Sequence, residues 1–374
     1  MSMETYSSKK EDNPQLQVYH SIKPGQTWLD TNGKPIQAHG FSVFYNDGVY
    51  YWYGENKEFT TQGSKVWTYG IRCYTSTDFY NWDDRGLIIM PDTTDVLSPI
   101  HPSQWLDRPH IIYCAKTQKY VAWIKNLGVG AGALTVMQAD DFMGPYQLIS
   151  YGVRPAGYEF GDFDLYVDKV TGKAYVWFER PHWEMICAEL NDDFTGVTDK
   201  LSHHMEGRIP PLTREAPAHF MHDGRHYLYT SGTSGFYPNE SLVTVFDDYQ
   251  DEYTDLGNPH PDDVTHTSYY SQITDVIKIP GKKDLYVALA DRWYSDSTQV
   301  EVSQREWARI GKLFAGHKPA PRNTECVGMK DMTSISRNGW DVTCKGTYVW
   351  LPITWEDGIP KLYWRDEWSL DEFE

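Results

Sequence analysis

SVFYNDGVYYWYGE, residues 42–55, has the pattern of one β-hairpin: a strand, a tight polar turn and a returning strand rich in Tyr and Trp. The turn offers Asn-Asp-Gly, residue types that accept the positive φ angles of a short hairpin turn. Four related stretches follow along the chain: HIIYCAKTQKYVAWIK (110–125), LYVDKVTGKAYVWFE (165–179), AHFMHDGRHYLYTSG (218–232) and the looser DVIKIPGKKDLYVALADRW (275–293). The hairpin is therefore a repeated unit.

The spacing of the repeat predicts the architecture. The returning strands begin near Tyr50, Tyr120, Tyr175, Tyr227 and Tyr286. Intervals of roughly 50–70 residues suit one four-stranded propeller blade per copy. The sequence thus predicts an all-β protein, a single five-bladed β-propeller over residues 16–374, preceded by a disordered N-terminal tail at 1–15. A two-sheet sandwich is the alternative, which five hairpins at near-constant spacing disfavour.

Segments between and after the hairpins complete this prediction. Residues 71–84 (IRCYTSTDFYNWDD) are typical of a further strand and turn, and SQREWARIGKLF (303–314) is a candidate helix. The C-terminal strand-turn-strand unit at 347–368 is expected to pair with residues 28–40 and close the ring. Mid-strand Trp52, Trp123, Trp177 and Trp350 are expected to fill the space between blades.

Composition narrows the classes of partner. The chain has 374 residues, 40% of them hydrophobic, and a formal net charge of -18. Such a charge repels nucleic acid and acidic polysaccharides but is indifferent to a neutral oligosaccharide or polysaccharide. A mean hydropathy of -0.59 argues against membrane spans. We expect a monomer or weak oligomer.

The N-terminus and the cysteines bear on location. MSMETYSSKKEDNPQ lacks the apolar core of a secretory signal. Five widely spaced Cys without a CxxC pair indicate buried thiols rather than disulfides or a structural zinc. A cytoplasmic protein is the resulting expectation, although a trimmed secreted form would look the same.

Carboxylates just before or within the predicted inner strands are the candidate chemical groups. Glu215, in TREAPAHF, stands before a Pro and an apolar strand, where an apolar pocket would raise its pKa and suit a general acid. The alternative is a surface Glu paired with Arg214. Asp162, Asp164 and Asp168 alternate along one strand and would share a face that lines a polar funnel.

Two further acids complete the candidate set. Asp107 precedes the second hairpin, and Glu55 follows the aromatic run of the first. The His residues show no metal-ligand spacing, so no metal site is expected. No cofactor is required, and a structural calcium ion in the funnel is allowed but not indicated. Neither a phosphate-binding loop nor a GxSxG motif follows a strand.

An ordered set of motifs carries a resemblance: AHG (38–40), YYWYGE (50–55), DRP (107–109), REAP (214–217), TSG (230–232), SQ (271–272), DRW (291–293) and YVWLP (348–352). Through them the chain resembles glycoside hydrolase family 43, and within it the exo-β-1,3-galactanase subfamily. The resemblance spans nearly the whole chain. It implies a five-bladed propeller that hydrolyses a terminal glycosidic bond with inversion, here releasing galactose from β-1,3-linked galacto-oligosaccharides or galactan.

The same resemblance implies roles for individual residues. Glu215 corresponds to the general acid and Asp162 to the carboxylate that raises the pKa of that acid. Most of the family has an Asp base in the first blade, but AHGFSVFY has none near Gly40, as in the galactanase subfamily; Gln272 of the SQ motif is the candidate that holds the water. Sugar contacts are implied for Glu55, Asp107, Glu206 and Thr233. Two further candidates for substrate binding are Trp293, which stands beside Asp291-Arg292 and could stack on a sugar, and His39.

Two departures from the subfamily bear on specificity. This chain has Asp107 where a Glu usually precedes Arg-Pro, and Lys125 where a His often follows the second-blade Trp. Two alternatives therefore remain open. One is α-L-arabinofuranosidase or β-xylosidase activity, and the other is a catalytically inactive carbohydrate-binding propeller.

Overall fold

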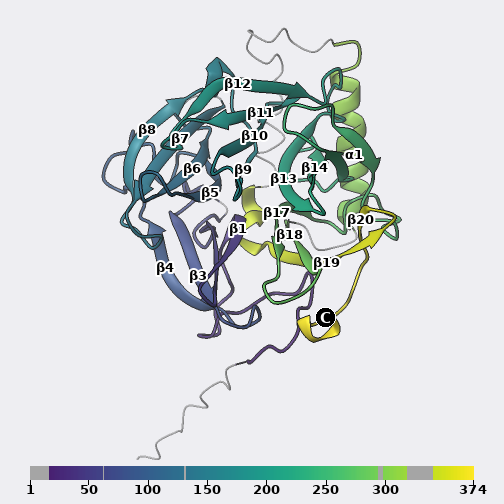
Figure 1. The fold of residues 1–374 in the computed structure, drawn as a ribbon, viewed down its shortest axis with the longest axis horizontal. Helices are drawn as coiled ribbons and strands as arrows, with labels where there is room; N and C mark the ends of the chain where they lie inside the picture. The colour runs from purple at the N-terminus through teal and green to yellow at the C-terminus, as the bar shows by residue number, and fades with distance from the viewer. Residues whose placement is uncertain (1–16, 62, 130–131, 294–297, 318–339) are drawn as a thin grey trace, which may run out of the picture.

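The computed structural model describes residues 17–374 apart from 62, 130–131, 294–297 and 318–339. Its strands form five four-stranded antiparallel sheets around a common centre (Figure 1). The prediction of an all-β, five-bladed propeller is therefore confirmed, and the sandwich is excluded. The tail predicted at residues 1–15 and Cys326 lie outside the described residues.

Each blade is built from strands that follow one another in the chain. Blade 1 comprises β1 (His39–Asn46), β2 (Val49–Glu55), β3 (Ile71–Ser76) and β4 (Asp83–Ile89). Blade 2 comprises β5 (Leu106–Cys114), β6 (Lys119–Asn126), β7 (Ala133–Ala139) and β8 (Gln147–Val153). Blade 3 comprises β9 (Phe163–Val167), β10 (Ala174–Arg180), β11 (Glu184–Leu190) and β12 (Val197–His204).

Blades 4 and 5 follow the same plan. Blade 4 comprises β13 (Arg214–His222), β14 (Arg225–Gly232), β15 (Leu242–Phe246) and β16 (Thr254–Gly257). Blade 5 comprises β17 (Gln272–Lys278), β18 (Tyr286–Arg292), β19 (Thr347–Glu356) and β20 (Ile359–Leu362). The helical elements are α1 (Thr298–Leu313), η1 (Pro155–Gly157), η2 (Trp340–Lys345) and η3 (Leu370–Glu372). The first strand of each blade lies nearest the centre (Figure 1).

Turn chemistry explains why the first hairpin forms where the sequence predicts it. Asn46 pairs with Val49, which leaves a two-residue turn of Asp47 and Gly48. Both turn residues have positive φ, 47° and 87°. That is the type I′ geometry whose twist matches antiparallel strands. Asp223-Gly224 in blade 4 repeats it, with φ of 49° and 76°.

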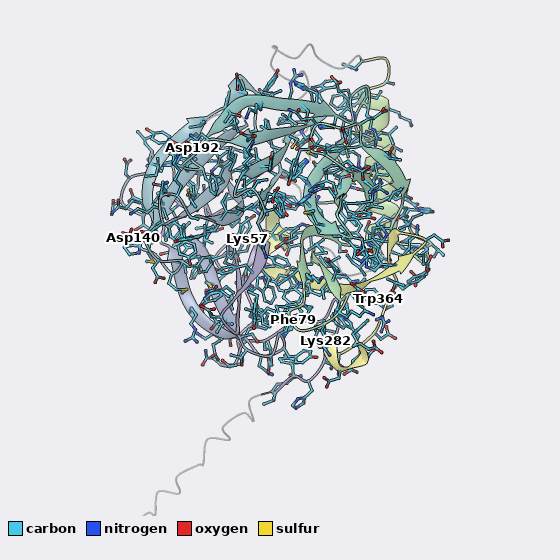
Figure 2. All side chains as sticks on the ribbon, in the orientation of Figure 1. Lys57, Phe79, Asp140, Asp192, Lys282 and Trp364 are labelled. Carbon is cyan, nitrogen blue, oxygen red and sulfur yellow. The ribbon has the colours of Figure 1, made fainter. Side chains whose placement is uncertain are left out.

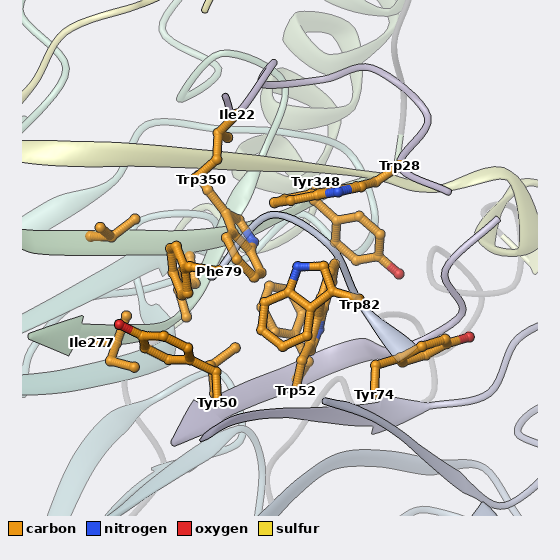
Figure 3. Packing of buried hydrophobic residues seen from close by; sticks show 14 of the residues in the cluster. Ile22, Trp28, Tyr50, Trp52, Tyr74, Phe79, Trp82, Ile277, Tyr348 and Trp350 are labelled. Carbon is orange, nitrogen blue, oxygen red and sulfur yellow. The ribbon is translucent and has the colours of Figure 1, made fainter. Parts of the chain in front are cut away.

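Aromatic side chains fill the space between blades 1 and 5 (Figure 3). The rings of Trp52 and Trp350 have centroids 4.6 Å apart, and Trp28 packs edge-on against Trp350 at 4.9 Å. Trp52, Trp123, Trp177 and Trp350 are all fully buried. Complete burial of one large apolar side chain stabilises a fold by about 1.5–3 kcal/mol, so these Trp residues hold blades together, as the sequence predicts.

Ring closure differs from the prediction. Residues 347–368 supply β19 and β20, and β19 pairs with β18 of its own blade rather than with residues 28–40. Within β19, residues 347–352 pair with β18 and residues 353–356 pair with β20. The N-terminal segment adds no strand there, but the Gly25 backbone N–H donates a hydrogen bond of 2.6 Å to the Tyr348 carbonyl. The N-terminal segment also reaches the C-terminal one through Ile22 and Trp368, whose backbones exchange hydrogen bonds of 2.8 and 3.0 Å.

The long insertion of blade 5 contains the predicted helix, which α1 confirms. The helix is drawn next to blade 4 (Figure 1), and its Trp307 lies close to Gly232 at the end of β14. Its Ile310 is buried in a cluster with Phe314 and Tyr237. Among the described residues, no helix is long and apolar enough to cross a membrane.

Charged side chains divide into two groups. Asp140 and Asp192 lie on the periphery, whereas Lys57 lies toward the centre of the ring (Figure 2). Cys73, Cys114 and Cys187 are buried free thiols, as expected, whereas Cys344 is a free thiol that is only partly buried.

The prediction that three aspartates line the funnel is wrong for Asp168. Strand β9 ends at Val167, and Asp168 begins the turn to β10, where its carboxylate accepts a hydrogen bond of 2.7 Å from the Val170 backbone. Asp162 and Asp164 are buried near the axis.

Candidate active site

One mouth of the propeller gathers the start of every first strand and the end of every second strand. These two ends lie side by side in an antiparallel hairpin, and five hairpins around one axis bring them together. A cavity of about 370 Å³ lies there. Its wall includes six of the predicted site residues: Glu55, Asp107, Asp162, Glu215, Gln272 and Trp293. Residues far apart in sequence, from all five blades, therefore meet in one cavity.

β-Bulges turn the backbone of three first strands at this mouth. The pairing register shifts at the start of β1, β5 and β13. Each bulge holds one residue with positive φ: Gly40 at 53°, Arg108 at 48° and Ala216 at 51°. A bulge redirects the neighbouring side chains. This is why Asp107 and Glu215 line the cavity at the very ends of their strands.

Glu215 lies in a buried part of the cavity wall. The side-chain amide of Gln272 approaches its carboxyl group, with Nε2 3.4 Å from Oε1. Burial raises the pKa of Glu215 well above its ordinary value, and the charges of Glu179 and Asp162 raise it further against the opposing Lys125 and Arg108. The site therefore favours the protonated form, which a general acid needs.

Asp162 has the opposite character. Burial alone would raise its pKa, but Arg108 and Lys125 outweigh burial and lower the pKa of Asp162 to about 2. Arg108 Nε lies 3.1 Å from one carboxylate oxygen, and Lys125 Nζ lies 2.7 Å from the other. Glu215 and Asp162 thus form a pair with separated pKa values, the arrangement that distinguishes an acid from a permanently charged neighbour.

Gln272 is clamped from two sides. Its Nε2 donates to Ser231 Oγ at 2.8 Å, and its Oε1 accepts from Arg108 Nη2 at 2.6 Å. The Nη1 atom of Arg108 is buried with no hydrogen-bond partner among the described residues. A water molecule or sugar oxygen beside Gln272 would satisfy that donor.

Glu55 belongs to a second charged group, which contacts the backbone of Arg108 rather than its guanidinium group. Its Oε2 lies 2.7 Å from the buried Lys57 Nζ, and its Oε1 accepts from the Arg108 backbone at 2.8 Å. Burial and the nearby Asp107 charge raise the pKa of Glu55 to about 7 against the pull of Lys57. Asp107 accepts a 2.5 Å hydrogen bond from Trp67 Nε1.

Three predicted sugar contacts do not line the cavity. His39 is fully buried behind it, where its Nδ1 lies 3.0 Å from Asp291 and its ring stacks on Tyr348. Thr233 is buried and its hydroxyl bonds Thr213 at 2.8 Å. Glu206 is exposed, beyond the end of β12. Their direct contact with a sugar remains a prediction that this geometry does not support.

Several cavity residues were not singled out from the sequence. They are Arg108, Glu179, His182 and the aromatic residues Trp67, Trp105 and Phe236. Glu179 could have been predicted from the sequence, because it ends the aromatic run AYVWFE just as Glu55 ends VYYWYGE. Arg108 lies in the DRP motif at 107–109, but its contacts with Asp162 and Gln272 depend on how three blades are arranged around the axis.

Two clusters of acids and histidines bear on metal binding. Glu184, His203 and Glu206 have side-chain atoms within 4.8 Å of one another, a spacing that a cation could bridge. However, Glu184 already pairs with Arg180 and His203, and none of the three lines the cavity. Glu179, His182 and Glu215 are equally close. All three residues of this second cluster line the cavity.

The cavity thus holds a buried carboxyl group with a raised pKa and a carboxylate with a lowered pKa. Glycoside hydrolases use pairs of carboxyl groups whose pKa values are separated in this way. Sequence comparison agrees with this class. The chain belongs to glycosyl hydrolases family 43, whose model matches residues 34–308. A search of curated proteins finds no match.

Solved structures extend the comparison. The family 43 β-1,3-galactosidase BT0265 is 29% identical with a TM-score of 0.74, covering 94% of this chain and 64% of that one. The β-1,3-galactosidase BT3683, solved with galactodeoxynojirimycin, is 25% identical with a TM-score of 0.74, covering 93% and 100%. The exo-β-1,3-galactanase of Phanerochaete chrysosporium with galactose is 22% identical with a TM-score of 0.71, covering 94% and 68%, and supports the fold alone. This chain thus spans less than two thirds of BT0265.

Proposed function

We propose that this protein is an inverting, exo-acting glycoside hydrolase that releases terminal galactose from β-1,3-linked galacto-oligosaccharides or galactan. The observation that carries the proposal is the contact between the buried Glu215 carboxyl group and the clamped Gln272 amide inside the cavity. The similarity to β-1,3-galactosidases at 25–29% identity supports galactose as the sugar.

Proton donation is the first half of the reaction. Glu215 donates its proton to the glycosidic oxygen, the bond between that oxygen and the anomeric carbon breaks, and the remaining glycan leaves as an alcohol. Asp162 remains ionised and holds Arg108 and Lys125 in place. Arg108 in turn holds the Gln272 amide.

Water attack is the second half. The water oxygen bonds to the anomeric carbon from the face opposite the leaving group as the glycosidic bond breaks, so a β-linked galactoside yields α-galactose. The proton that this water loses passes to solvent, and Glu215 regains a proton from solvent before the next turnover. The first blade has no Asp near Gly40 to act as the usual base. A Cβ atom at Gly40 would lie 2.2 Å from Glu55 Oε1, so even an alanine there would displace the Glu55 carboxylate. We therefore assign the water to the Gln272 amide.

Sugar recognition falls to the rest of the wall. Glu55 and Asp107 offer carboxylate oxygens for hydroxyl groups. Trp67 and Trp105 stack at 4.7 Å, and Phe236 meets Trp293 edge-on at 5.4 Å. These rings supply apolar faces against which a pyranose ring can pack.

The test is a panel of β-1,3-galactobiose and the nitrophenyl glycosides of galactose, arabinofuranose and xylose, with the product anomer followed by proton NMR. We expect galactobiose cleavage with α-galactose appearing first. Preferred cleavage of the arabinofuranoside or xyloside would establish the related family activity instead. Binding without hydrolysis of any member would establish an inactive carbohydrate-binding propeller.

A substitution tests the water assignment. Gln272→Ala should abolish turnover while the protein stays folded, because the amide next to Glu215 is lost. Gln250→Ala, at an exposed position in blade 4, is the matched control and should keep full activity. Near-normal activity of Gln272→Ala would exclude the role of this amide.

A further inference from the structure

Glu179 is a second carboxylate beside the proposed acid. It lies near the end of β10, in blade 3, and is 2% exposed. Glu179, His182 and Glu215 each place a side-chain oxygen or nitrogen atom within 4.8 Å of the others. The Glu179 carboxylate is fixed there, because its Oε1 accepts a 2.6 Å hydrogen bond from the His182 backbone.

The charge of Asp162, in contrast, is largely compensated. Two cations contact it, Arg108 Nε at 3.1 Å and Lys125 Nζ at 2.7 Å. Both are almost buried, so solvent screens their attraction little. Seen from Glu215, the negative charge of Asp162 is offset by two positive charges at close range.

We propose that Glu179, rather than Asp162, is the carboxylate that keeps Glu215 protonated for proton donation. Glu179 is then a positioning residue that acts through Glu215. The inference rests on the proposed function only where it says that this proton is donated to a substrate. Whether Glu179 keeps Glu215 protonated is a property of the free protein.

The charged groups around Glu215 support this assignment. Glu179 comes from β10, and His182 follows that strand. Asp162 directly precedes β9, Arg108 comes from β5 and Lys125 from β6. Gln272, from β17, is neutral. After burial, Glu179 raises the pKa of Glu215 most and Asp162 comes second, while Lys125 and Arg108 lower it. His182 Nδ1, 3.2 Å from Glu179, would weaken the effect when protonated.

Direct titration tests the proposal without any substrate. The protein is labelled with ¹³C at the glutamate carboxyl groups, and the Glu215 resonance is identified by its loss in Glu215→Gln. We expect Glu179→Gln to lower the titration midpoint of Glu215 by about 1–2 pH units, and Asp162→Asn to lower it by less. Glu179→Gln keeps a carbonyl acceptor for the His182 backbone. If Glu179→Gln does not fold, Glu179→Asp, which withdraws the charge by one methylene, should still lower the midpoint.

An unchanged midpoint in the folded Glu179 variant, or a larger shift in Asp162→Asn, would overturn the proposal. Kinetics give a second readout. Glu179→Gln should move the alkaline limb of kcat/KM for β-1,3-galactobiose to lower pH. It should lower kcat for dinitrophenyl β-galactoside less than kcat for galactobiose, because the dinitrophenolate departs without a proton. Equal losses on both substrates would indicate a merely structural role. If the wild-type protein cleaves no galactoside, the proposed function fails while the titration still decides the role of Glu179.

Discussion

Gly40→Ala adds one methyl group to the first blade, at a position that lines the cavity. Gly40 has a φ of 53°. The new Cβ would lie 2.2 Å from Glu55 Oε1 and 3.2 Å from the Arg108 backbone nitrogen. Because the Arg108 backbone cannot retreat easily, the Glu55 carboxylate must move.

The free-energy cost follows from two effects. An alanine in the left-handed region costs about 1–2 kcal/mol. Moving Glu55 breaks its 2.8 Å hydrogen bond from the Arg108 backbone, and a buried donor without a partner costs about 1–3 kcal/mol. The free energy of unfolding should therefore fall by about 2–5 kcal/mol, a large share of the about 5–15 kcal/mol typical of folded proteins.

Urea denaturation and kcat/KM on β-1,3-galactobiose measure the two consequences. Gly48→Ala is the matched control, since Gly48 also has positive φ, 87°, but a Cβ there meets nothing within 4 Å. We expect Gly48→Ala to lose only about 1–2 kcal/mol and keep full activity, whereas Gly40→Ala also loses at least tenfold in kcat/KM. Equal stability losses and equal activities in the two variants would refute the reasoning that Gly40 makes room for Glu55.

Four other outcomes are expected. Glu215→Gln should lower kcat on galactobiose by about 10²–10⁴-fold in steady-state assays. Asp162, with its pKa lowered from 3.8 to about 2, stabilises the fold above pH 3.8 and loses this effect toward pH 2; urea titrations of Asp162→Asn should show a weaker pH dependence in that window. Glu55 works in the opposite sense: its pKa is raised from 4.5 to about 7, so its contribution to stability falls as the pH rises between those values. In Glu55→Gln, the urea midpoint should therefore depend less on pH in that range. Trp350→Ala, in the seam between blades 1 and 5, should cost about 3–5 kcal/mol by the same measurement.

The position of each blade could be predicted from the sequence alone, because the formation of a hairpin depends on residues that are close together in the chain. Asp47-Gly48 and Asp223-Gly224 have the turn chemistry that a two-residue loop needs, and the Tyr- and Trp-rich returning strands mark each repeat. Motif order also led to Glu215, Asp162 and Gln272, and the structure brings these three into one cavity. Their chemical roles remain predictions.

Tertiary structure decided how the cavity wall is arranged. Period-2 alternation placed Asp168 with Asp162 and Asp164, but β9 ends before it reaches Asp168. Likewise, family position suggested sugar contacts for His39, Glu206 and Thr233, which lie outside the cavity wall. Strand ends and bulges depend on pairing with distant segments, so local pattern does not determine them.

The pKa of Glu215 shows most clearly the difference between what local sequence predicts and what depends on distant segments. Glu215 can be found from four letters, REAP, but its pKa depends on Glu179, Asp162, Lys125 and Arg108 from two other blades. Electrostatic interactions act over distances in space, and burial weakens the screening by water. The sequence therefore determined which residue could serve as the acid, whereas only the closed ring of blades decided what surrounds it.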